Sequence, residues 1–229
     1  MSFILQIDTA FKTASISLSF AGELMFEETN TEMKDHAAFV QPAIKNILQR
    51  ADISAKELAA IAVCYGPGSY TGLRVGMASA KGLCYALNKP LVTIGSLQVL
   101  TRAAIEQQSV PTEVIFCPMI DARRMEVYTA LFDANMSELL SPVAMVLTAD
   151  SFANWLLKNT IWFFGDGAAK FIQLIDYQRV VVKAAGNNAL AMSKLAFQKY
   201  ELGDFADNAY VEPLYLKDFF SPNITPVNL

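Results

Sequence analysis

The chain has 229 residues, 53% of them hydrophobic, which is enough to bury one large core or two smaller ones. A formal net charge of −4 excludes a protein that attracts nucleic acid through its overall field, so any RNA would need a partner to supply most of the positive charge. No apolar run reaches the ~18 residues of a membrane span, and the N-terminal MSFILQIDTA lacks the basic region of a signal peptide. We therefore expect a cytoplasmic protein of one or two domains.

Two strand-like segments open the chain, residues 3–7 and 14–20, and Asp8 lies at the corner between them. The stretch KDHAAFVQPAIKNILQRA (34–51) places its apolar residues on one stripe, which predicts an amphipathic helix. Strands and helices then alternate, and we expect them at 58–65 (strand), 73–88 (helix), 90–97 (strand) and 97–108 (helix).

The polar stretch around 109–112 breaks this alternation and predicts a boundary between a first lobe, 1–108, and a second lobe, 109–229. The second lobe is expected to open with paired strands at 113–120 and 126–132, joined by the turn DARRM. Because both units begin with a hairpin and continue with alternating elements, the sequence predicts an α/β duplication, although no repeat is visible residue by residue. The remaining elements are expected as a helix containing Phe152, Trp155 and Leu156, a strand at 160–165, a helix at 168–175, a strand at 179–184, a helix at 188–202 and an extended C-terminal tail.

The loop CYGPGSYTGLRVG (64–76) stands between a buried strand and a helix. It does not fit a P-loop, which needs a lysine directly after its last glycine, and a dinucleotide-binding fingerprint would need a third glycine where Thr71 stands. The remaining argument for phosphate binding is that a helix N-terminus can bind an anion, which is a weak signal because every helix shares it.

The helix after this loop carries a small side chain at every fourth position: Gly72, Gly76, Ala80 and Cys84. A glycine inside a helix costs roughly 1 kcal/mol relative to alanine, so Gly76 needs a reason to be there. Close backbone approach is such a reason. The stripe either packs on the chain's own sheet or faces another subunit, and the sequence leaves both alternatives open.

Five blocks of the sequence, in this order, resemble the signature blocks of the TsaB (YeaZ) family: ILQIDTAFKTASISL, AVCYGPGSYTGLRVGMASAKGL, IDARRMEVYTALF, FFGDGAAKF and VEPLYLKDF. The resemblance implies a two-lobed α/β fold of the actin, sugar-kinase and Hsp70 superfamily, with a mixed sheet flanked by helices in each lobe. It also implies work in the bacterial synthesis of N6-threonylcarbamoyladenosine in tRNA, next to the anticodon.

The resemblance implies a non-catalytic role, because the related catalytic subunit, TsaD, carries a metal-binding H-x-x-x-H downstream of the shared loop. Ser96 and Leu100 occupy the two histidine places here, and the chain has one histidine in all. We therefore expect no catalytic residue and no metal site. The expected surface for a TsaD-type subunit lies on the first-lobe helices, at Gly72, Leu73, Gly76, Met77, Ala80, Cys84, His36 and Phe39.

The runner-up hypothesis is a stand-alone phosphotransferase or hydrolase, with a nucleotide held by Asp8, Gly165, Asp166 and Gly167. Against it, the turn DTAFKT has no glycine and carries a bulky phenylalanine, and Asp and Gly at strand ends are ordinary turn residues. A relict metallopeptidase is a third hypothesis, disfavoured by the missing histidines. ATP or ADP with Mg²⁺ at a subunit junction, a TsaE-type ATPase subunit, tRNA reached indirectly through the complex and a homodimer of the isolated chain are further expectations.

Overall fold

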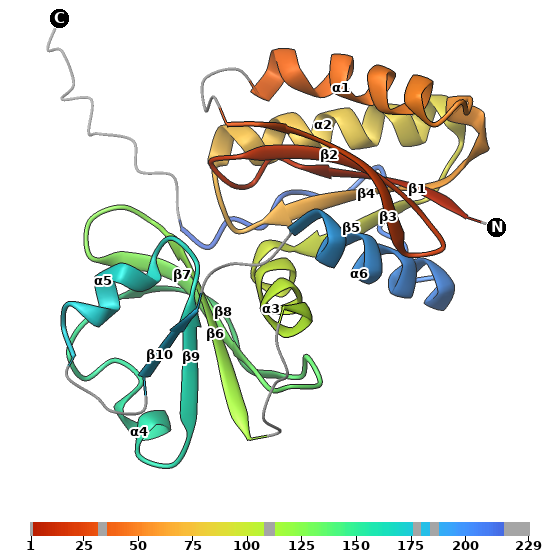
Figure 1. The fold of residues 1–229 in the computed structure, drawn as a ribbon. Coiled ribbons are helices and arrows are strands. Elements are labelled where there is room, and N and C mark those ends of the chain that lie inside the picture. Colours follow the sequence, from red (N-terminus) through yellow and green to blue (C-terminus); the bar gives the residue numbers. More distant parts are fainter. Residues whose placement is uncertain (1, 32–35, 108–112, 176–179, 184–187, 218–229) are drawn as a thin grey trace, which may run out of the picture.

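The computed structural model describes residues 2–31, 36–107, 113–175, 180–183 and 188–217, and it shows two lobes, each built on a five-stranded sheet (Figure 1). In the first lobe a hairpin and a third antiparallel strand are followed by parallel strands, because the later connections run through helices. Its elements are β1 (Phe3–Asp8), β2 (Ala14–Phe20), β3 (Glu23–Asn30), α1 (His36–Arg50), η1 (Ala55–Glu57), β4 (Leu58–Gly66), α2 (Tyr70–Leu87), β5 (Leu91–Gly95) and α3 (Ser96–Glu106).

The second lobe repeats this plan. Its sheet order, β10-β9-β6-β7-β8, is the first lobe's order, β3-β2-β1-β4-β5, read from the other edge. The expected α/β duplication is thus confirmed at the level of topology. The elements of this part of the chain are β6 (Val114–Asp121), β7 (Glu126–Phe132), β8 (Glu138–Val146), α4 (Ala153–Leu156), β9 (Thr160–Phe164), α5 (Ala168–Ile172), β10 (Val180–Lys183) and α6 (Asn188–Leu202).

The third strand of each lobe, β3 and β8, was not expected from the sequence. Both lie at the edge of their sheet and are only half-buried. The acidic EETN in β3 and Pro142 in β8 hide the usual strand pattern, since charged residues and proline are tolerated only at such edges. At these two edge strands the alternation of apolar and polar residues therefore fails as a signal.

The predicted domain boundary is wrong for the last part of the chain. Helix α6 was assigned to the second lobe, but it packs on the first sheet against β1, β2, β3 and β5, and beside α3 (Figure 1). The segment after it stays on the same lobe, where the amide of Ala206 donates to the carbonyl of Leu91. The first lobe thus consists of the N-terminal residues together with α6 and the segment that follows it, while residues 108–112 lie outside the described part of the chain.

The small-residue stripe of α2 packs on the chain's own sheet, which decides the alternative that the sequence left open. Ala80 and Cys84 are buried in the core of the first lobe. A Cβ added at Gly76 would lie 2.3 Å from Oγ1 of Thr9, so only a hydrogen fits there. Four residues of the stripe and their neighbours Leu73 and Met77 are thus unavailable to a partner in this arrangement, which corrects their assignment as partner-facing residues.

Within the described residues, no helix combines the length and the apolar character that a membrane span requires.

The packing of α2 predicts opposite effects for two glycines of the same helix. Gly76→Leu is expected to lower the free energy of unfolding by roughly 1 to 3 kcal/mol, the usual range for overpacking, because the new side chain would collide with Oγ1 of Thr9. Gly82→Ala is the matched control: nothing lies within 4 Å of its Cβ position, so this change should stabilise the helix by up to about 1 kcal/mol. Urea unfolding of the three proteins measures both effects, and a Gly76→Leu chain as stable as wild type would contradict the packing.

Candidate functional site

The loop GPGSYTG lies directly on the turn that follows β1. The amide of Ser69 donates to the carbonyl of Ala10 at 2.8 Å, and Oγ1 of Thr9 donates to the carbonyl of Gly72 at 2.7 Å. A Cβ at Gly68 would lie 2.4 Å from the oxygen of Ala10, and one at Gly72 would lie 2.0 Å from the oxygen of Thr9. The glycines therefore allow two backbone segments to touch, and the first-lobe turn occupies the space in front of the helix.

Asp8 lies beneath this contact in a buried polar cluster. Its side chain accepts a hydrogen bond from the amide of Ala10 at 3.1 Å and lies beside the thiol of Cys64, whose sulfur is 3.1 Å from Oγ of Ser96. Burial raises the pKa of Asp8 from 3.8 to about 6, and the hydrogen bonds from Ala10 and Cys64 only partly offset this. Asp8 is 3% exposed, so the first turn does not present its carboxyl group to a ligand in the isolated chain.

Cys64 does not have the environment of a nucleophile. Burial, and next the charge of Asp8, raise its pKa well above the ordinary value, so the protonated thiol predominates at neutral pH. His36, the one histidine of the chain, contacts the carbonyl of Phe11 through Nε2 at 3.3 Å. The cluster of Asp8, Cys64 and Ser96 therefore supports the loop contact from below.

Ser96 and Leu100, which the resemblance places at the positions of metal-binding histidines, are both buried on α3. Ser96 is fully buried and contacts Cys64, while Leu100 packs into the core between α3 and the second sheet. In the described part of the chain, no group of three or more His, Cys, Asp or Glu side chains is arranged to hold a metal ion. Ser96 thus belongs to the polar cluster inside the first lobe, and Leu100 contributes to packing between the lobes.

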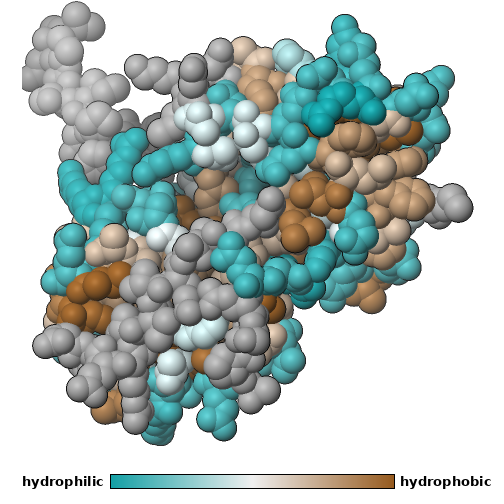
Figure 2. Space-filling model, in the orientation of Figure 1, coloured by the Kyte–Doolittle hydropathy of each residue, from teal (hydrophilic) through white to brown (hydrophobic). Residues whose placement is uncertain are grey.

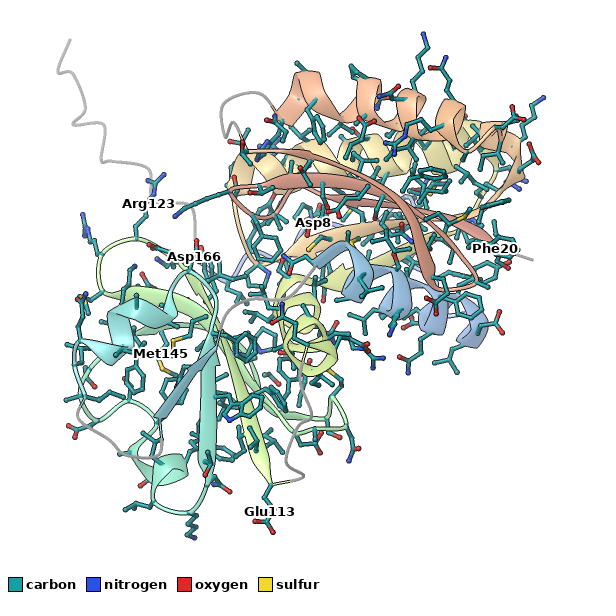
Figure 3. The ribbon with its side chains drawn as sticks, in the orientation of Figure 1. Asp8, Phe20, Glu113, Arg123, Met145 and Asp166 are labelled. Atoms are coloured by element: carbon teal, nitrogen blue, oxygen red, sulfur yellow. The ribbon has the colours of Figure 1, made fainter. Side chains whose placement is uncertain are left out.

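The turn after β1 in the first lobe and the GDG turn after β9 in the second lobe lie close together between the lobes (Figure 3). Lys12, in the turn of the first lobe, lies 3.5 Å from the carboxylate of Asp166, in the GDG turn of the second. Phe11, beside Lys12, packs against buried residues of both lobes. Asp8 and Asp166, the two carboxylates of the nucleotide hypothesis, thus lie on facing turns, but the chain's own side chains bridge the space between these turns.

Both glycines of the GDG turn are explained by packing on β6. A Cβ at Gly165 would lie 2.3 Å from the carbonyl oxygen of Met119. One at Gly167 would lie 3.1 Å from the carbonyl carbon of Ile120 in β6 and 2.8 Å from Val127 in the neighbouring β7. This close approach lets Oδ1 of Asp166 accept the amide of Asp121 at 2.8 Å. Nucleotide binding by these residues remains a prediction.

Of the residues assigned to a partner surface, only Phe39 on α1 is not buried, so the assignment of His36 is corrected as well. Phe39 is half-buried and packs against the first-lobe core, and His36 is 8% exposed with no hydrogen bond to its buried Nδ1. The exposed face of α2 lies on the other side of the helix from the stripe, and its small residues are Ala78, Gly82 and Ala86. Their spacing of four residues is the same signal as the stripe's, and the periodicity of the sequence alone could have found them.

The chain is similar to known proteins that are named for the threonylcarbamoyladenosine modification of tRNA. A model of the TsaD family, described as tRNA N6-adenosine threonylcarbamoyltransferase, matches residues 25–212. A protein of Bacillus subtilis named tRNA threonylcarbamoyladenosine biosynthesis protein TsaB is 33% identical over 180 residues, which cover 76% of this chain and 75% of that protein. The TsaB protein of Haemophilus influenzae is 27% identical over 226 residues, 94% of this chain and 93% of that protein.

A solved structure from Pseudomonas aeruginosa, described as similar to the peptidase YeaZ, has a TM-score of 0.81 at 23% identity. The match covers 95% of this chain and all of that one (100%), so it shows a common fold. The two-lobed actin-like fold that the sequence led us to expect is therefore confirmed.

The buried Asp8 predicts a pH dependence of stability. Because its pKa is about 6 in the folded chain and near 3.8 in the unfolded chain, the folded state binds the proton more tightly. The stability from this proton is fully present below pH ~4 and is lost as the pH rises through about 6, a difference on the order of 3 kcal/mol. The free energy of unfolding of Asp8→Asn, measured in urea, should therefore increase relative to that of the wild type as the pH rises from 4 to 7.

Glu106→Gln supplies a control of opposite sign. A hydrogen bond from Lys194 and the charge of Arg102 lower the pKa of Glu106 despite partial burial, so its contribution is present at neutral pH and lost in acid. Glu106→Gln should thus be less stable than wild type at pH 7 and approach it at low pH. For Asp8 itself, the contradicting result would be a free energy of unfolding that changes with pH in the same way in Asp8→Asn and in the wild type, since this would mean that the buried carboxyl does not titrate as described.

Proposed function

Because the chain belongs to the TsaB family and takes part in tRNA threonylcarbamoyladenosine biosynthesis, we propose that it supports a TsaD-type catalytic subunit without itself catalysing the transfer. The observation that carries the proposal is a family match over residues 25–212 in a chain with Ser96 and Leu100 at the metal-binding positions. The burial of both side chains supports it, since each has a packing role.

The partner surface that we propose is the exposed face of α1 and α2. These helices cover one side of the first sheet, opposite α6 (Figure 1). On α2 this face presents Ala78, Gly82 and Ala86 beside Tyr85, which is 86% exposed. The glycine has no packing reason within the chain, because nothing lies within 4 Å of its Cβ position. Small residues allow close helix contact with a TsaD-type subunit or, in the isolated chain, with a second copy.

We further propose that ATP or ADP with Mg²⁺ binds at the junction with the catalytic subunit and not to the chain alone. Asp8 is buried, and Phe11 and the Lys12–Asp166 pair lie between the facing turns. The residues of the isolated chain therefore do not fit a nucleotide with its metal ion. A TsaE-type ATPase subunit and tRNA join through the assembled complex.

Reconstitution tests the non-catalytic role. A mixture of the chain, TsaD-type and TsaE-type subunits, ATP, threonine-derived donor and unmodified tRNA is expected to form threonylcarbamoyladenosine, measured by mass spectrometry of digested tRNA. Omission of the chain should abolish or strongly reduce the product. Product formed by the chain without the TsaD-type subunit would overturn the proposal.

The partner surface predicts that Ala78→Arg weakens association by about tenfold to a hundredfold, since overpacking of about 1 to 3 kcal/mol is placed in the interface. The melting temperature should hardly change, because Ala78 is exposed. Calorimetric titration with the TsaD-type subunit measures the affinity. Gln198→Arg, an exposed position of α6 on the opposite side of the sheet, is the matched control. Equal affinities of the two variants would exclude this face of α2.

The alternative of a stand-alone phosphotransferase or hydrolase makes a different prediction. The purified chain is expected to turn over ATP far below about 1 per second, the low end of typical enzymes, because Asp8 is not accessible. Release of phosphate from ATP, followed with the wild-type chain and Asp8→Asn, measures this. Turnover at an enzyme-like rate that disappears in Asp8→Asn would favour the alternative.

A further inference from the structure

The turn that joins β6 and β7 carries two consecutive arginines whose backbone conformation is unfavourable for residues with a Cβ. Arg123 has φ of 69° and Arg124 has φ of 49°, in the left-handed region. Such a conformation is unfavourable for a residue with a Cβ, and asparagine and glycine adopt it more readily. The turn is held by the amide of Arg123, which donates to Oδ1 of Asp121, and by the amide of Glu126, which donates to the carbonyl of Arg123. These arginines therefore lower the stability of the turn in which they stand.

The acidic residues around this turn are already paired with lysines. Oδ1 of Asp121 lies 2.6 Å from Nζ of Lys170, and the carboxylate of Glu126 contacts Nζ of Lys217. The hydrogen bond and charge of Lys170, with the amide of Arg123, outweigh burial and lower the pKa of Asp121, so it stays ionised and paired.

The third nearby carboxylate, Asp166, lies 3.5 Å from Lys12. Among the described residues, no ion pair or hydrogen bond involves the guanidinium group of Arg123 or Arg124, and both residues are exposed. Counting only residues that the structure describes, these three acids and three lysines balance, so the two arginines leave a local charge of +2 on a chain whose net charge is −4.

The same lysines hold the turn rigidly. Lys170 donates to the carbonyl of Glu126 at 3.0 Å, and Lys217 donates to the carbonyl of Ala122 at 3.1 Å and lies over the ring of Tyr128. On the side toward the first lobe, Asp166 accepts the amide of Asp121. The backbones of β6 and β7 are thus fixed close to the apex of the hairpin. The backbone that carries the arginines therefore loses less conformational entropy when a ligand binds.

The arginines lie on the outside of the molecule. Figure 3 shows Arg123 at the apex of the hairpin, beyond Asp166, and Figure 2 shows hydrophilic residues along the end of the second lobe that faces the first. Guanidinium groups suit phosphate because their planar donors match its oxygens in pairs, whereas a cleft nucleotide would have to displace the Lys12–Asp166 contact.

We propose that the apex of the β6–β7 hairpin, through Arg123 and Arg124, contacts the phosphate backbone of the tRNA while the chain is bound to its catalytic partner. The inference rests on the proposed function and adds to it a direct contact with RNA. It gives the chain a positioning role, in which the strained turn is retained because it presents two positive charges to the RNA on a fixed backbone.

The test uses the complex of the chain with the TsaD-type subunit and a fluorescein-labelled, unmodified tRNA. The double variant Arg123→Asn/Arg124→Gly should weaken tRNA binding by about tenfold at 100 mM salt. It should also reduce the slope of log affinity against log salt by about 1 to 2, as expected for the loss of one or two phosphate contacts. Fluorescence anisotropy measures both quantities. The melting temperature of the variant should rise, because asparagine and glycine relieve the backbone strain.

Two controls isolate the contribution of the turn. Arg123→Lys/Arg124→Lys keeps both charges and should retain most of the affinity and the salt slope. Lys56→Asn/Lys158→Asn removes the same charge at exposed positions away from the hairpin, in η1 of the first lobe and after α4 at the other end of the second (Figure 1). It should bind tRNA as the wild type does.

Unchanged tRNA affinity in an intact complex would overturn the inference, and so would an equal loss in the Lys56 and Lys158 control. Loss of the complex itself would also overturn it, because it would assign the arginines to a protein contact. Competition by ATP at constant ionic strength that depends on both arginines would assign them to a nucleotide and would also overturn it. Failure of the proposed function is distinguishable, because the wild-type chain would then form no complex with the TsaD-type subunit.

Discussion

The contact between the GPGSYTG loop and the turn after β1 is the constraint on which the first lobe depends. Three positions, Gly68, Gly72 and Gly76, have no room for a Cβ because backbone or side-chain oxygens of the first turn occupy it. The N-terminal half of α2 is thereby pressed onto β1 and β4, and its orientation fixes which face remains exposed. A glycine-rich loop before a helix is thus used for packing between parts of one chain.

The same contact explains the chemistry beneath it. A turn covered by a loop excludes water, so the carboxyl group of Asp8 is buried and its proton is held more tightly. The thiol of Cys64 is protonated for the same reason. A carboxylate at the end of β1 thus becomes a structural group in the isolated chain, which agrees with a role that depends on a catalytic partner.

The second lobe uses the corresponding parts in another way. Its glycine turn also packs on a strand, since Gly165 and Gly167 lie against β6, but the hairpin that follows β6 remains exposed and is fixed by Lys170 and Lys217. Lys217 comes from the segment after α6, which crosses from the first lobe, where the amide of Leu214 donates to the carbonyl of Tyr65. The C-terminal segment therefore links the packed turn of one lobe to the charged turn of the other.

The sequence by itself determined the alternation of strands and helices, the two hairpin-led units and the absence of metal-binding histidines, because periodicity and residue type are local properties. It missed β3 and β8, since edge strands tolerate charge and proline. It could show that Gly76 requires close approach, but not to what, because a stripe of small residues looks the same whether it meets a sheet or a partner. Only the tertiary structure decided that Thr9 lies against Gly76, that α6 returns to the first sheet, and that lysines from distant segments neutralise the acids beside Arg123. These are contacts between residues far apart in the chain, and no local pattern encodes which of them meet.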